Sequence, residues 1–136
     1  MSPTGSLILV QRPELLDELS ALVATLPWGP GRGLNFQHAE GDLAQTINFW
    51  RGRDGALPLG FIATDESSAL VALSNGVDEA AVIPAEASAL AAFVDRFELR
   101  ARLRADTQRL HERFAHAEKL TALGTLVAGV GHEINN

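Results

Sequence analysis

His132, near the end of this 136-residue chain, has neighbours that could make it reactive. Glu133 follows it directly, and Asn136 lies one helical turn further on. A neutral imidazole nitrogen is a nucleophile, and an adjacent carboxylate can hold the second ring nitrogen or accept its proton. The zinc-protease motif His-Glu-x-x-His is incomplete, because its second histidine would fall at Asn136. The pattern therefore predicts chemistry at a histidine without a metal. We interpret the other three histidines as ordinary side chains: His38, His111 and His116.

The composition is that of a folded protein without disulfides. Hydrophobic residues make up 46% of the chain, which is ample for a core. Cysteine is absent, which excludes disulfides and thiolate metal sites. No apolar run approaches the roughly 18 residues of a membrane span, and the first residues lack the basic region of a secretory signal. We therefore expect a cytoplasmic protein with no membrane span.

Charge is distributed unevenly along the chain. Residues 1–95 carry 4 basic and 12 acidic groups, whereas residues 96–136 carry 7 basic and 5 acidic groups. A basic helix can bind nucleic acid, but three acidic residues interrupt this run and no aromatic stacking residues accompany it. A solvated helix face with internal ion pairs explains the pattern better, so we expect no nucleic-acid partner.

Short apolar runs alternate with helical patterns over the first two thirds of the chain. This alternation predicts an α/β fold, with a parallel sheet of about four strands and helices on both of its faces. The predicted strands are residues 6–10, 34–38, 57–63 and 80–83.

The ends of the predicted helices carry capping signals. Pro13 suits the start of the first helix, and Asp42 can cap the second. Thr64 or Asp65 can cap the third. In the third helix we expect three large side chains to face the core: Leu70, Val71 and Leu73.

A long helix is predicted from about residue 85 to the end of the chain. At about 1.5 Å per residue it would span roughly 78 Å, which is more than one small domain can cover. Six of its residues repeat with the spacing 4-3-4-3-4, which favours a parallel two-stranded coiled coil and a homodimer. A single helix packed on its own domain is the alternative. We call these residues the first seam: Leu103, Thr107, Leu110, Phe114, Ala117 and Thr121.

A second apolar repeat follows, out of phase with the first. Its spacing is 3-4-3-4, and the change of phase predicts a local change of supercoiling. We call these residues the second seam: Leu120, Leu123, Val127, Val130 and Ile134.

The end of the chain is similar to the phosphoacceptor (HisKA-type dimerisation) helix of two-component sensor histidine kinases. The similarity covers residues 120–136 and includes His132-Glu133-Ile134-Asn135-Asn136 behind a small-residue apolar helix. It implies that His132 is the phosphoacceptor, Glu133 its acid or base, and Asn136 a polar position used in dephosphorylating a response regulator. It also implies ATP and Mg²⁺ as cofactors of the parent kinase. Neither the second helix of the family's hairpin nor its ATP-binding domain occurs in these residues, so we expect no cofactor and no activity in this chain alone.

The first domain resembles a response-regulator receiver, which has a flavodoxin-like fold. In the family, acidic residues after the first strand bind magnesium, and here these positions are Gln11 and Arg12. The switch hydroxyl is retained as Thr64, whereas the lysine position is Ile83. Phosphorylating an aspartate requires Mg²⁺ held by carboxylates. The resemblance therefore implies a pseudo-receiver that takes no phosphate, with one strand–helix unit fewer than a receiver. An α/β domain of another family is the alternative.

Together these patterns predict three segments. Residues 1–92 form the receiver-like domain, 93–119 a coiled-coil signalling helix, and 120–136 the first part of the phosphoacceptor helix. The predicted function is the sensory and dimerisation region of a histidine kinase, with an unknown protein or ligand as the input and a response regulator as the partner. The alternative is a non-catalytic homodimeric scaffold.

Overall fold

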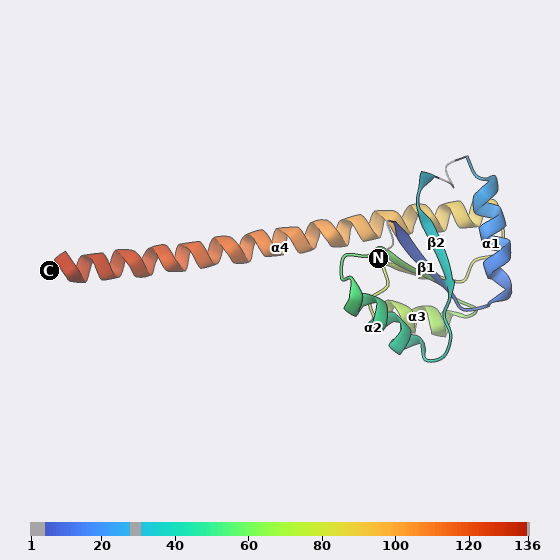
Figure 1. Ribbon diagram of the computed structural model, residues 1–136, viewed down its shortest axis with the longest axis horizontal. Coiled ribbons are helices and arrows are strands. Elements are labelled where there is room, and N and C mark those ends of the chain that lie inside the picture. The colour runs from blue at the N-terminus through green and yellow to red at the C-terminus, as the bar shows by residue number, and fades with distance from the viewer. Residues whose placement is uncertain (1–4, 28–30, 136) are drawn as a thin grey trace. The chain divides into compact units, whose positions relative to one another are not determined.

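The structure is a computed structural model that describes residues 5–27 and 31–135, and the side chains of His132 and Asn135 lie outside the described part. The chain divides into two units, Met1–Arg102 and Leu103–Asn136. Strands and helices alternate along it, as Figure 1 shows. In chain order the elements are β1 (Ser6–Val10), α1 (Glu14–Thr25), β2 (Leu34–His38), α2 (Leu43–Arg53), β3 (Leu59–Ile62), α3 (Glu66–Ser74), β4 (Glu79–Ala81) and α4 (Ala87–Asn135).

The sheet has four parallel strands in the order β2-β1-β3-β4. Helices α2 and α3 cover one face, and α1 with the first turns of α4 covers the other (Figure 1). The predicted α/β fold is therefore confirmed. The strand order is that of a flavodoxin-like sheet with one strand fewer, since the complete order is 2-1-3-4-5. The last two strands are shorter than predicted.

Helix α3 packs on the sheet with small side chains, which contradicts the predicted inner face. Ala69 and Ala72 are buried against the sheet. The larger side chains Leu70, Val71 and Leu73 are exposed instead. Apolar residues lie all round this helix, so its sequence does not select an inner face, and alanine permits the closer approach to the sheet.

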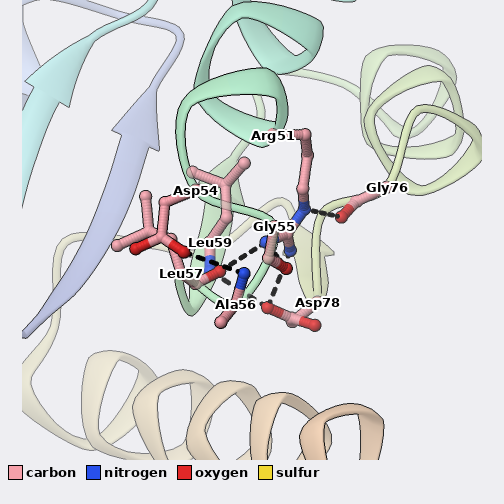
Figure 2. A network of polar contacts seen from close by, with 8 residues as sticks. All are labelled: Arg51, Asp54, Gly55, Ala56, Leu57, Leu59, Gly76 and Asp78. Atoms are coloured by element: carbon pink, nitrogen blue, oxygen red, sulfur yellow. Dashed lines mark hydrogen bonds and ion pairs between the residues drawn. The ribbon is translucent and has the colours of Figure 1, made fainter. Parts of the chain in front are cut away.

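The amino ends of β3 and β4 are joined by a buried ion pair (Figure 2). Arg51 of α2 places Nη2 3.0 Å from Oδ2 of Asp78, whose side chain is only 1% exposed. The same Oδ2 accepts a hydrogen bond from the Leu59 backbone N–H at 3.0 Å. Arg51 also donates to the carbonyl oxygens of Gly76 and Leu57. One guanidinium therefore connects the end of α2 with the loops that lead into both strands.

On the other face of the sheet, α4 packs with an aromatic pair. Phe93 and Phe97 are fully buried and stacked, with ring centroids 6.2 Å apart. They lie over Gly60 of β3, where an added Cβ would be 3.2 Å from Cδ2 of Phe97. Glycine at this position therefore lets the first turns of α4 approach the sheet.

Replacing Gly60 by valine should destabilise the packing of α4. The branched side chain would overlap both phenylalanine rings, and overpacking of this kind costs about 1–3 kcal/mol. Urea unfolding followed by tryptophan fluorescence measures the change. Gly55→Val is the matched control, because an added Cβ at Gly55 meets no atom within 4 Å. Equal stability of the two variants would contradict the packing argument.

Candidate functional site

The predicted phosphoacceptor segment is the end of α4. His132 and Glu133 lie within this 49-residue helix, which also contains the turns packed on the sheet. Glu133 is exposed, and the neighbouring Ile134 is 77% exposed. Asn136 lies outside the described residues, as does the His132 side chain. An exposed carboxylate on a helix, next to a histidine, is compatible with proton transfer to a solvent-accessible reactant.

The second unit leaves its apolar side chains exposed. Residues 106–130 are all exposed, and Phe114 is 66% exposed. Monomeric proteins rarely expose a continuous apolar stripe of this length. The exposed large side chains include members of both seams: Leu103, Leu110, Phe114, Leu120, Leu123, Val127, Val130 and Ile134.

The threonines of the first seam are compatible with an apolar contact. The hydroxyl of Thr107 donates to the Leu103 carbonyl oxygen at 2.8 Å, and that of Thr121 donates to the Ala117 carbonyl oxygen at 3.0 Å. Both hydroxyls therefore have a partner within the helix, so burying these side chains leaves no unsatisfied donor.

The structure brings together two of the four predicted receiver positions, at the carboxyl edge of the sheet. Gln11 follows β1, and Thr64 lies just beyond the end of β3. The Gln11 Oε1 atom accepts hydrogen bonds from the Thr64 backbone N–H at 2.8 Å and from its hydroxyl at 2.9 Å. The Gln11 Nε2 atom donates to Oγ of Ser68 at 3.1 Å. The side-chain amide of Gln11 thus joins β1 to the start of α3 at the switch point of the sheet, where open α/β folds bind their ligands.

Asp65 caps α3, as one of the two predicted alternatives stated. Its Oδ1 accepts from the Ser68 backbone N–H at 2.8 Å, and its Oδ2 lies 3.3 Å from the Ser68 hydroxyl. These hydrogen bonds to the charged carboxylate, with the backbone N–H of Ser68 first, hold the pKa of Asp65 below its usual value. The capping contribution is therefore present at neutral pH, above the pKa of the unfolded chain, and is lost as the pH falls through the lowered pKa.

The other two receiver positions lie apart from this network. Arg12 is exposed and lies 3.9 Å from a carboxylate oxygen of Glu14. Ile83 is partly buried and packs against the apolar cluster between the sheet and α4. An aliphatic side chain is therefore part of the core at the position predicted to correspond to a receiver's lysine.

Sequence reasoning missed two contributors to this edge, Ser68 and His38. Ser68 bonds to both Gln11 and Asp65, and Nε2 of His38 lies 3.1 Å from the Gln11 carbonyl oxygen. Only their place in the sequence could have indicated this location, because a polar residue at the end of a parallel strand or in the first turn of the next helix lies at this edge.

Within the described residues, no group of three or more histidine, cysteine, aspartate or glutamate side chains is placed to hold a metal ion. In the same part of the chain, each helix is too short or too polar to cross a membrane. The chain matches no known protein family, no curated protein and no solved structure.

Proposed function

We propose that this chain is the sensory and dimerisation region of a two-component histidine kinase, with His132 as the phosphoacceptor. The proposal depends mainly on one observation. A single helix, α4, begins on the α/β domain, exposes the first seam and ends in the His132 motif. A domain, a dimerisation stripe and a phosphoacceptor in this order form a device that can pass a signal to the histidine.

His132 supplies the nucleophile in this proposal. Its neutral imidazole attacks the γ-phosphorus of ATP, the bond to the bridging oxygen breaks, and ADP leaves. Glu133 stabilises or accepts the proton of the other ring nitrogen. Mg²⁺ and ATP belong to the catalytic domain of the parent kinase. The phosphoryl group then passes to an aspartate of a response regulator in the cytoplasm.

The first seam supports a parallel homodimer. Thr107, Phe114 and Thr121 take the a positions of the heptads, and Leu110 takes a d position. The flanking g position Arg113 would then face the e position Glu118 of the second copy. Opposite charges at g and e favour parallel pairing in register.

The network around Gln11 supports a domain that is not phosphorylated. A receiver requires carboxylates at the end of β1 to hold Mg²⁺. Gln11 is neutral here, and both polar atoms of its side chain bond to the protein itself through Thr64 and Ser68. The domain would then sense a protein or ligand by another route and act through α4.

Transfer of phosphate to His132 tests the proposal. With labelled ATP and the ATP-binding domain of a histidine kinase added in trans, the chain should acquire an acid-labile label. His132→Gln should abolish this label. Glu133→Gln should slow it about 10²–10⁴-fold, which is the usual contribution of a general acid or base. His116→Gln is the matched control, because His116 is an exposed histidine on the same helix. Label that persists in His132→Gln would refute the assignment, and absence of label in every variant would favour the non-catalytic scaffold.

A further inference from the structure

Charged residues of α4 form ion pairs on two opposite flanks of the helix. On one flank, Nη1 of Arg32 lies 3.1 Å from Oδ1 of Asp95 and 3.3 Å from Oε2 of Glu98. Arg32 precedes β2, which is one edge strand of the sheet. The acidic flank of α4 therefore faces the β2 edge.

The other flank has the opposite charge. Oε2 of Glu79 lies 3.4 Å from Nε of Arg96 and 3.6 Å from Nε of Arg100. Glu79 belongs to β4, the other edge strand, and its side chain is only 8% exposed. The basic flank of α4 therefore faces the β4 edge, through a carboxylate that is almost withdrawn from water.

An apolar ridge separates the two flanks and contacts the sheet. It comprises Leu90, Phe93, Val94 and Phe97, and the nearby Ala101 is also buried. The ridge brings α4 onto the sheet, but apolar contact is not directional and tolerates small rotations. The charges are directional, because turning the helix toward either edge lengthens one set of ion pairs. A half-turn would bring acidic residues to Glu79 and basic residues to Arg32.

We propose that Arg32 and Glu79 are positioning residues that set the rotation of α4 about its own axis. They act from the two edges of the sheet, with opposite charges, on residues 95–100. A change at either edge, such as a bound ion or partner that competes for these charges, would alter that rotation. The consequence for the first seam rests on the proposed function, since a continuous helix passes a rotation to the residues that follow. The positioning of α4 on the sheet involves residues of the first unit only.

Single cysteines can report this rotation, because the chain has no cysteine of its own. Three alanines offer matched reporter sites. Ala101 is buried on α4, Ala72 is buried on the opposite face of the sheet, and Ala92 is exposed on α4. Each is replaced by cysteine in a separate chain, and its rate of alkylation is measured under native conditions. The measurement is repeated with Arg32→Gln and Glu79→Gln introduced together.

We expect the glutamine substitutions to raise the alkylation rate of a cysteine at position 101 at least about tenfold. The alkylation rate at position 72 should change less than about twofold, because only one element moves. Position 92 gives the rate of an unprotected thiol. A charge exchange on the β2 flank tests the ion pairs themselves. It combines Arg32→Glu with Asp95→Arg and Glu98→Arg and keeps Glu79. In this chain the cysteine at position 101 should be protected again, in contrast to the chain with both glutamines.

Two results would overturn the proposal. An unchanged rate at position 101 would show that the ion pairs do not position α4. A parallel rise at positions 72 and 101 would show that they only stabilise the domain as a whole. Neither result depends on dimerisation or on phosphorylation of His132, so a failure here is distinguishable from a failure of the proposed function.

Discussion

Asp78→Ala should lower the free energy of unfolding of the α/β domain by about 3–5 kcal/mol, the usual effect of removing one partner of a buried ion pair. The substitution leaves the Arg51 guanidinium, whose side chain is 16% exposed, without its carboxylate. It also removes the acceptor of the Leu59 backbone N–H at the start of β3. Domains of this size are stable by only about 5–15 kcal/mol, so the variant should be close to unfolding.

Urea unfolding followed by tryptophan fluorescence measures this loss, because Trp50 packs against the same side of the core. Asp78→Asn should have an intermediate effect, since its amide oxygen can still accept from the Leu59 N–H. Glu14→Ala is the matched control, because Glu14 is the carboxylate of an exposed ion pair with Arg12. A difference below about 1 kcal/mol between Asp78→Ala and Glu14→Ala would show that the network of Figure 2 contributes little beyond a surface contact.

Placing lysines at Leu110 and Phe114 should dissociate the proposed homodimer. Each buried apolar side chain contributes about 1.5–3 kcal/mol, and the two copies lose four of them together. Repulsion between the introduced charges adds to this loss. The dissociation constant should therefore rise by at least about 10⁴-fold, at about 1.4 kcal/mol for each factor of ten. Sedimentation equilibrium measures the change.

Gln108→Lys with Ala115→Lys is the matched control for the seam. Both residues are exposed and take b positions of the heptads, on the outer side of a coiled coil. The parallel orientation of the two α4 helices can be tested separately. A single cysteine at position 110 should form a disulfide between two copies, and a single cysteine at position 115 should not. Equal dissociation of both lysine variants would refute the seam. Efficient cross-linking at position 115 would place the contact on another face of α4.

The local patterns of the sequence determined much of the fold. Ser6–Val10 and Leu34–His38 form strands as predicted, and Asp42 caps α2 through the Gln45 N–H. These features depend on neighbouring residues, on apolar runs and on capping groups, which a sequence displays directly. The long final helix was predicted from local patterns for the same reason. The motif around His132 likewise comes from sequence alone, and phosphorylation at this residue stays a prediction.

Other features depend on residues that are far apart in the sequence, and only the tertiary structure decided them. α3 turns Ala69 and Ala72 inward because the depth available above the sheet, rather than the helix itself, selects small side chains. The hydrogen bond that the Thr64 backbone N–H donates to the Gln11 side chain joins the ends of two strands that are adjacent only in the folded sheet.

The same reasoning applies to the charges. The sequence gives the balance of acidic and basic residues, but an ion pair depends on distance and burial. Arg51 and Asp78 meet because α2 ends close to where β4 begins, and Arg32 and Glu79 reach α4 from the two edges of the sheet. Composition therefore predicted a helix with charged faces. The packing of that helix on a twisted sheet decided which charges position it, because only packing brings distant side chains within about 4 Å of each other.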